Sequence, residues 1–358
     1  MAISPIQSAL HAVAPSVYIA VNNTVKNWRS GKANRRFLVV RHPRKPDLYQ
    51  IVLDFVEKVC PELRNRFELR TLGCHIRDWS PYLLQIAWVK DPIQCWSTIA
   101  YDQAVQLAAD CDAHRIPVIN RADCLTNAAK AEGAKRMNVC GLRTPKMELI
   151  TDPAEFRKTL LGIEPPLLVR ENLGHGQPMY YAHTHDDARQ LPIESLRNPV
   201  AVEYIDVRDP ADGLFRKYRY VIAGDRGAPL HMHVTREWTA RGSNMLYSDS
   251  ICAEEHEFLN HPSPHHQAFQ TACHAIGLDF VALDYSYDQN GQVVVWEANP
   301  LPLLHYPRRR QYRTSPLERA LAAIVNLYLT RAGLDVPAAI LDLLPPIPAT
   351  SAGNVAAR

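Results

Sequence analysis

Glycine is scarce in this chain, which has 15 glycines and 27 prolines among its 358 residues. Any fold that depends on glycine-rich loops must therefore form here with few glycines. Paired cysteines are also absent, because the eight cysteines are scattered singly and none forms a Cys-x-x-Cys pair. This spacing gives no support to a zinc knuckle or to a thioredoxin-like redox site.

Long apolar runs and an excess of one charge are missing as well. No uninterrupted apolar run approaches the ~18 residues that a membrane-spanning helix needs. The first residues lack an early positive charge and Pro15 interrupts their apolar stretch, which is atypical of a signal peptide, so we expect a cytoplasmic protein. Lys and Arg number 40 against 37 Asp and Glu, and this balance argues against a dedicated nucleic-acid-binding protein.

The chain is long enough for two or three domains, at roughly 100–200 residues per domain. Strand-like and helix-like segments alternate over 36–120, which predicts a parallel α/β layer. The chain after it has the pattern of an antiparallel-rich α+β fold, with helices expected over 123–140 and 254–276. Before and after these regions we expect an N-terminal extension, 1–35, and a Pro/Ala-rich tail, 334–358.

The most informative stretch is 277–302, where two apolar segments flank the turn sequence Asp-Gln-Asn-Gly. Asp284 lies in the first segment, and Glu297 and Asn299 end the second. Residues two apart in a strand face the same side, so Glu297 and Asn299 project together. Because the turn lies nearly midway between Asp284 and Glu297, hairpin pairing brings these two opposite each other. Two carboxylates and an amide oxygen on one face suit Mg²⁺ or Mn²⁺, and the alternative is a surface hairpin with solvated acids.

This pattern, an apolar residue and Asp before a turn and then apolar-Glu-x-Asn-Pro, resembles the metal-binding hairpin of the ATP-grasp superfamily. That superfamily includes carboxylate–amine ligases such as glutathione synthetase and the ribosomal-protein glutamate ligases. The resemblance runs in order from about Pro117 to Pro302, about half of the chain. It implies an α/β N-terminal domain followed by an α+β ATP-grasp fold, in which two antiparallel-rich sheets grip ATP. The implied domains are a pre-ATP-grasp domain, a small lid subdomain and a central subdomain that holds the metal, at 36–120, 121–202 and 203–333.

The resemblance also implies residues that bind the ATP phosphates. A helix lysine of the family precedes the glycine of a Gly-x-x-x-Pro motif by eleven residues, which fits Lys130, and Lys135 is its competitor. Arg170 stands where the family has a strand-end lysine, and it keeps the charge while adding a bidentate fork. The phosphate loop that follows retains two glycines with a histidine between them, Gly174, His175 and Gly176.

Two further segments match strands of the family. Glu203, Tyr204 and Ile205 resemble the hinge that contacts the adenine of ATP. Arg219 resembles the arginine that faces the γ-phosphate and the acyl phosphate, which is the catalytic role. Lys217 lies two residues earlier and therefore on the same face of the strand. The metal ligands implied by the hairpin are Asp284, Glu297 and Asn299.

Together these features imply a Mg²⁺- and ATP-dependent ligase. It would join a carboxylate to an amine through an acyl phosphate and release ADP and phosphate. We expect small-molecule substrates of the amino-acid or peptide type and no nucleic-acid or membrane partner, and a homodimer is compatible with these expectations. A kinase of the same fold that phosphorylates a small molecule is one alternative, and a catalytically weak nucleotide-binding regulatory protein is another, because the phosphate loop has few glycines.

Three features depart from the family or stay outside it. D-alanine–D-alanine ligases have an arginine two residues before the metal aspartate, and Ala282 at that place counts against their activity. The basic run Arg308–Arg313 is a solvated face or an attraction for an anionic substrate. We interpret His231, His233 and the cluster at 261–266 as exposed loop histidines, since no HExxH motif accompanies them.

Overall fold

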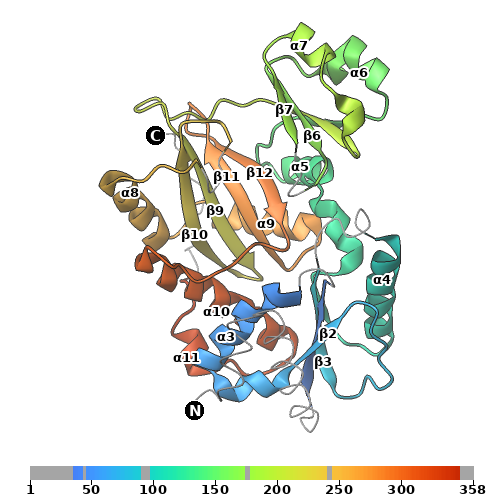
Figure 1. The fold of residues 1–358 in the computed structure, drawn as a ribbon. Helices are drawn as coiled ribbons and strands as arrows, with labels where there is room; N and C mark the ends of the chain where they lie inside the picture. Colours follow the sequence, from blue (N-terminus) through green and yellow to red (C-terminus); the bar gives the residue numbers. More distant parts are fainter. Residues whose placement is uncertain (1–34, 43–45, 90–96, 174–177, 240–243, 347–358) are drawn as a thin grey trace, which may run out of the picture. The chain divides into compact units, whose positions relative to one another are not determined.

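The computed structural model describes residues 35–42, 46–89, 97–173, 178–239 and 244–346. They form two compact units (Figure 1). The first unit contains the described chain up to Asp123 together with Leu303–Leu344, and the second is built from Cys124–Pro302. Most of the predicted extension and the end of the predicted tail lie outside the described residues.

The first unit is built on a four-stranded sheet in the order β2-β1-β3-β4, and each pairing described in it is parallel. Its strands are β1 (Arg36–Arg41), β2 (Phe67–Thr71), β3 (Tyr82–Trp88) and β4 (Val118–Ile119). The middle of β1 is fully buried, as in a strand that is covered on both faces. The helices are α3 (Gln50–Val59), α4 (Thr98–Ala113), α10 (Thr314–Arg331) and α11 (Ala338–Leu341), with short 3₁₀ helices η1 (Pro46–Tyr49), η2 (Pro61–Arg66) and η7 (Gln311–Arg313).

Helix α10 belongs to this first unit although it lies late in the chain. Its buried residues lie on all of its sides between Pro316 and Leu329, and such a helix needs apolar cover all round. It packs against α3, where Lys58 and Glu318 form an ion pair of 2.6 Å. The predicted central subdomain extends to residue 333, whereas the residues from Leu303 on lie in the first unit.

The second unit contains two antiparallel four-stranded sheets (Figure 1). The small sheet has the order β5-β8-β6-β7, with β5 (Met147–Leu149), β6 (Leu167–Glu171), β7 (Met179–Ala182) and β8 (Pro199–Glu203). The large sheet has the order β10-β9-β11-β12, with β9 (Phe215–Ala223), β10 (Arg226–Thr235), β11 (Phe280–Tyr287) and β12 (Val293–Asn299). The α-helices are α5 (Lys130–Val139), α6 (Pro153–Thr159), α7 (His185–Arg189), α8 (Asp249–Asn260) and α9 (His266–Ile276), and the 3₁₀ helices are η4 (Ala122–Ala128), η5 (Leu160–Gly162) and η6 (Ile193–Ser195).

Two helices that the sequence pattern predicts as continuous are broken. The predicted helix 123–140 divides into η4 and α5, because Ala129 has an extended backbone with φ −57° and ψ 148°. The predicted helix 254–276 divides into α8 and α9. The break contains Pro262 and Pro264, which lack the backbone N–H that a continuous helix would use.

The two faces of the large sheet differ in chemistry. Tyr220 and Tyr285 lie on the face that α9 covers, and both pack against Phe269 of that helix, with ring centroids 5.7 and 5.0 Å apart. Because side chains alternate along a strand, Arg219 and Asp284 project from the opposite face. The large sheet therefore has one apolar face and one face that carries charged groups.

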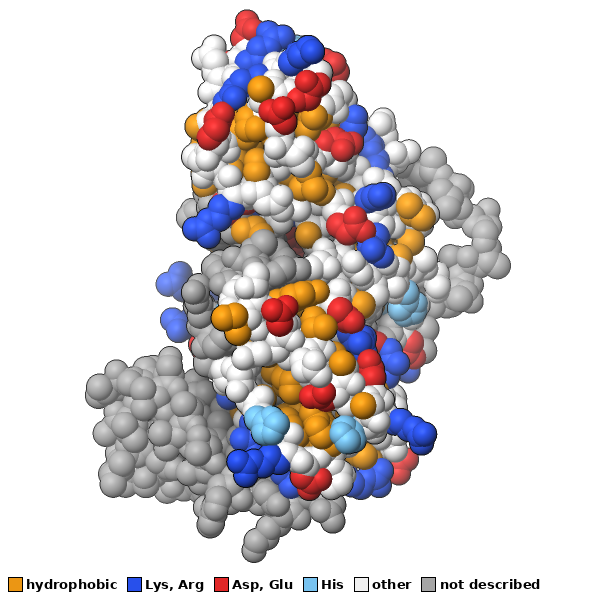
Figure 2. All heavy atoms as spheres, turned by 90° about the vertical axis from the view of Figure 1, so that its right-hand side faces the viewer, with side chains coloured by type: hydrophobic (Ala, Val, Ile, Leu, Met, Phe, Trp, Pro, Cys, Tyr) orange, Lys and Arg blue, Asp and Glu red, His pale blue; other side chains and the backbone are white. Residues whose placement is uncertain are grey.

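The outer surface mixes both signs of charge. In the part of the face that Figure 2 colours, Lys and Arg side chains are interspersed with Asp and Glu. Among the described residues, no helix has both the length and the apolar character needed to cross a bilayer.

Candidate functional site

The hairpin of β11 and β12 forms with the register that the sequence predicts. Asp284 pairs with Glu297, and Ala282 pairs with Asn299. At the turn, the carboxylate of Asp288 accepts hydrogen bonds from the backbone N–H groups of Asn290 and Gln292, both at 2.9 Å. The predicted placement of Asp284 opposite Glu297 is therefore confirmed.

Asp284 is almost completely buried and is paired with two cations of β9. Arg219 donates to it in a bidentate manner, from Nε to Oδ1 at 2.5 Å and from Nη2 to Oδ2 at 2.8 Å. Lys217 adds a contact of 3.2 Å from Nζ to Oδ2. Burial by itself raises the pKa of Asp284, but the charges of Arg219 and Lys217 outweigh it, so this pKa lies well below its usual range. The carboxylate is therefore ionised at neutral pH.

Glu297 is paired with Lys130, which begins α5. Both side chains are buried, with 14% of Glu297 and 5% of Lys130 exposed. Burial and the nearby charge of Arg170 lower the pKa of Lys130. Burial raises the pKa of Glu297, but the charge of Lys130 outweighs it and the net shift is downward. Lys135, the competing lysine, is exposed on the same helix.

Arg170 approaches this pair from the small sheet. It lies in β6, and its Nη2 is 3.4 Å from the backbone oxygen of Leu173. The buried Asn172 accepts a hydrogen bond from the backbone N–H of Ala131 at 3.0 Å, so it ties the end of β6 to the first turn of α5. Sequence reasoning missed Asn172. Gly174, His175 and Gly176 lie outside the described residues.

The charged groups form one cluster that spans both sheets of the second unit. It contains four cations against two carboxylates, which leaves a net charge of +2: Lys130, Arg170, Lys217 and Arg219 with Asp284 and Glu297. An excess of converging cations favours a polyanion such as a chain of phosphates.

The donor set suits a hydrated magnesium ion, although the carboxylates now pair with cations. Within the described residues there is no group of three or more His, Cys, Asp and Glu side chains that could hold a metal. Mg²⁺ commonly binds through one or two carboxylates, with phosphate oxygens and waters as the other ligands. The amide nitrogen of Asn299 is buried without a hydrogen-bond partner in the described structure, while its oxygen accepts from the N–H of Leu301 at 3.2 Å. Asp284, Glu297 and the amide oxygen of Asn299 therefore fit such an ion.

The predicted hinge residues lie apart from the charged cluster, at the end of β8. The carboxylate of Glu203 accepts from the backbone N–H of Lys146 at 2.8 Å, and Ile205 is buried. Tyr204 lines a cavity of about 880 Å³. Tyr181 and Trp238 also line it, and their rings stack with centroids 5.5 Å apart. The cavity thus offers aromatic faces that suit a flat ring.

Sequence reasoning missed Trp238 and misplaced two histidines. His231 and His233 are half-buried in β10, with parallel rings 4.3 Å apart, and the expectation of exposed loop histidines is wrong for them. They pair with Arg219 and Lys217 of β9, so they continue the charged face across the sheet. The available signal was their spacing of two residues, which is the period of a strand and places both on one face.

The cluster at 261–266 is also partly internal. His266 is buried, and its Nδ1 lies 3.0 Å from the hydroxyl of Tyr220. His265 contacts the hydroxyl of Tyr287 at 3.1 Å. These two histidines therefore support the packing of α9 on the large sheet and are not exposed loop residues as expected.

Comparison with known proteins identifies the fold. No family model matches the chain, and no curated protein matches it. Solved structures do match it. D-alanine–D-alanine ligase from Bacillus anthracis complexed with ATP is 13% identical, with 85% of this chain and 99% of that chain covered, at a TM-score of 0.52. The ATP-grasp ligase PsnB, complexed with a phosphomimetic variant of its minimal precursor, Mg and ADP, is 11% identical, with 83% and 100% covered and a TM-score of 0.52.

A RimK domain ATP-grasp protein from Sphaerobacter thermophilus is 12% identical, with 81% of this chain and 98% of that chain covered, at a TM-score of 0.51. Such identities establish likeness of fold alone. The chain therefore has the ATP-grasp fold, and the resemblance seen in the sequence is confirmed at that level.

Proposed function

We propose that this protein is an ATP- and Mg²⁺-dependent ligase that joins a carboxylate to an amine. The observation that carries the proposal is the buried cluster in which Arg219 and Lys217 hold Asp284 while Lys130 holds Glu297. Cations that now neutralise two carboxylates are placed to receive phosphates when those carboxylates take up a metal. Solved structures of the same fold contain ATP, or Mg and ADP, which supports this assignment.

The residues of the cluster divide the work. Lys130 and Arg170 would bind the phosphate chain, and Arg219 would face the phosphoryl group in transfer, where fixed cations stabilise the charge that develops. Asp284, Glu297 and the amide oxygen of Asn299 would hold the Mg²⁺ ion, which when bound would supply positive charge that stabilises the phosphates. Lys217 would balance Asp284 when Arg219 turns toward the phosphate.

The base of the nucleotide would lie at the hinge. Glu203 ends β8, and Tyr204 and Ile205 follow it, with Tyr204 lining the aromatic cavity. Tyr181 and Trp238 offer ring faces for stacking.

The carboxylate substrate would attack the γ-phosphorus, giving an acyl phosphate and ADP. The amine then attacks the activated carbonyl and expels phosphate. A free carboxylate is a poor electrophile, so phosphorylation is what makes amide formation feasible. An amino acid or peptide is the proposed substrate class, and Ala282 in place of an arginine disfavours D-alanine–D-alanine ligation.

The test is ADP release from ATP and Mg²⁺ across a panel of amino acids and short peptides, with and without hydroxylamine. A ligase releases ADP only with its substrates and accumulates a hydroxamate when hydroxylamine captures the acyl phosphate. Arg219→Gln lowers the rate by about 10²-fold or more, as expected for loss of a group that stabilises transition-state charge.

The exposed Lys135 supplies the matched control, because Lys135→Gln changes charge on α5 without touching the cluster. We expect this variant to keep the full rate. ADP release accompanied by a stable phosphorylated product, with neither hydroxamate nor amide, would indicate a kinase instead. Equal rates for the wild type and Arg219→Gln would rule out the proposed site.

A further inference from the structure

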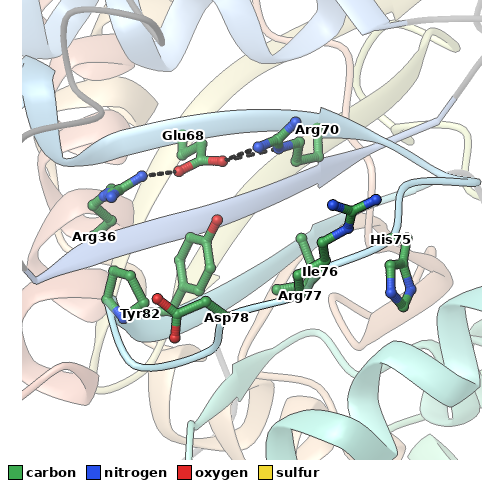
Figure 3. Close-up of a pocket in the computed structure, with 9 residues that line it drawn as sticks. Arg36, Glu68, Arg70, His75, Ile76, Arg77, Asp78 and Tyr82 are labelled. Carbon is green, nitrogen blue, oxygen red and sulfur yellow. Dashed lines mark hydrogen bonds and ion pairs between the residues drawn. The ribbon is translucent and has the colours of Figure 1, made fainter.

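A cavity of about 430 Å³ is lined by residues of the first unit, none of which belongs to the charged cluster of the second unit (Figure 3). Arg36 and Tyr82 begin β1 and β3, and Glu68 is the second residue of β2. The cavity therefore lies toward the amino ends of the parallel strands. Ligand crevices of open α/β sheets lie at the carboxyl ends, so this cavity differs from that crevice.

Glu68 lines the cavity and accepts several hydrogen bonds from its neighbours. It is buried, with 4% of its side chain exposed. It accepts from Nη1 of Arg36 at 2.5 Å, and from Nε and Nη2 of Arg70 at 2.9 and 2.6 Å (Figure 3). Burial raises its pKa, but hydrogen bonds from Tyr82 and from both arginines outweigh it, and the net shift is downward. Glu68 thus fixes two guanidinium groups and has little acceptor capacity left.

The other acid of the cavity is engaged in its own loop. Asp78 accepts from the backbone N–H and the hydroxyl of Ser80, at 3.0 and 2.7 Å. Arg77 and His75, which belong to the same loop, have no hydrogen bond or ion pair among the described residues. Figure 3 shows the guanidinium of Arg77 pointing toward the side of the cavity where Arg70 lies.

The charges of the lining do not balance. Three arginines face two carboxylates, which leaves +1 before any charge on His75. Glu68 accepts from Arg36 and Arg70, and Oδ1 of Asp78 accepts from Ser80, so the side chains of Arg77 and His75 are the N–H donors that lack a partner among the described residues. Such a lining is selective for an oxyanion, and the planar fork of arginine matches the oxygens of a carboxylate or a phosphate.

We propose that this cavity binds a small molecule through a carboxylate or phosphate group held between Arg70 and Arg77, with His75 as a further donor. The volume lies within the range of about 300–1,000 Å³ that is typical of small-molecule sites. Ile76 and Pro81 supply an apolar wall for a short carbon skeleton. The site is independent of the proposed ligase activity, because none of its residues belongs to the charged cluster.

The test is isothermal titration calorimetry of the full chain at low ionic strength with three probes: inorganic phosphate, succinate and the uncharged succinamide. We expect saturable binding of phosphate or of succinate, and none of succinamide. Preference between the first two identifies the acidic group. Arg77→Ala weakens the binding at least about tenfold, because it removes one of the two forks.

Arg331→Ala is the matched control, since Arg331 is an exposed arginine at the end of α10, in the same unit and outside the cavity. It should leave the affinity unchanged. Phosphate that binds only the charged cluster of the second unit would give the same affinity in Arg77→Ala as in the wild type, and that result overturns the proposal. Absence of saturable binding by either anion overturns it as well. Neither result affects the ADP-release assay, so the two proposals fail separately.

Discussion

Replacing Lys130 with methionine separates the stability of the free site from its affinity for metal. In the free protein the Lys130 ammonium neutralises Glu297, and both side chains are buried. Methionine fills a similar volume without charge. Without Lys130, burial and the neighbouring Asp284 raise the pKa of Glu297. The charge of Lys217 still lowers this pKa, but its effect is weaker.

The magnitude follows from the burial of the pair. Removing one partner of a buried ion pair costs about 3–5 kcal/mol. Lys130 itself suffers from burial and from the charge of Arg170, so the lower end of this range, about 3 kcal/mol, is the expected loss. For a domain of 150–250 residues, each 1 kcal/mol shifts the Tm by about 2–4 °C, so we expect a fall of about 6–12 °C.

Magnesium should reverse much of this loss. In Lys130→Met the carboxylates of Glu297 and Asp284 face each other with less neutralising charge, so Mg²⁺ no longer competes with the ammonium. A ligand at 100 times its Kd that binds only the native state adds about 2.7 kcal/mol. The variant should therefore gain more stability from Mg²⁺ than the wild type does.

The assay is thermal unfolding of wild type, Lys130→Met and Lys135→Met, each with EDTA and with a series of Mg²⁺ concentrations. Lys135 is exposed, and its replacement should change the free energy of unfolding by no more than about 0.5 kcal/mol. If Lys130→Met unfolds at the wild-type temperature, the buried pair does not have the energetic role assigned to it. If Mg²⁺ stabilises wild type and variant equally, Lys130 does not compete with a metal for Glu297.

Three further predictions concern other parts of the chain. The folded-state pKa of Glu68 is below its unfolded value, so its contribution to stability is full above about pH 5 and is lost as the pH falls through the folded pKa. In Glu68→Gln, the free energy of unfolding measured with urea should therefore fall less steeply at acid pH than in the wild type. An unchanged fall would contradict this. Gly227→Ala would place a Cβ 2.5 Å from Cε1 of Tyr220, so we expect a loss of about 1–3 kcal/mol in urea unfolding, and a neutral effect would refute the close packing. Trp238 lines the aromatic cavity, so ATP with Mg²⁺ should change its fluorescence. We expect Trp238→Phe to abolish the change and Trp79→Phe, a variant of the first unit, to retain it. The opposite pattern would place the base elsewhere.

The hairpin of β11 and β12 was predictable because local signals determine it. The turn sequence sets the register, and the register places Asp284 opposite Glu297 without any knowledge of the rest of the fold. Periodicity and turn chemistry are enough for such elements.

Other features depend on contacts distant in sequence. The burial of Lys130 requires the break at Ala129 and the pairing with Glu297, 167 residues away. Trp238 follows the end of β10 and has no local pattern that marks it as a cavity residue. His231 and His233 gain their meaning from their pairing with β9, and no helix or strand period in the sequence indicates that neighbour.

The scarcity of glycine in the predicted phosphate loop makes the strength of nucleotide binding the central question. The most direct measurement is calorimetric titration of the non-hydrolysable analogue AMPPNP into the wild type and into Glu297→Gln, each with Mg²⁺ and with EDTA. The proposed metal site predicts saturable binding by the wild type that weakens at least about tenfold in EDTA. It also predicts weak binding by Glu297→Gln that Mg²⁺ does not restore, because the carboxylate that holds the metal is lost. Equal affinity in all four titrations would contradict it.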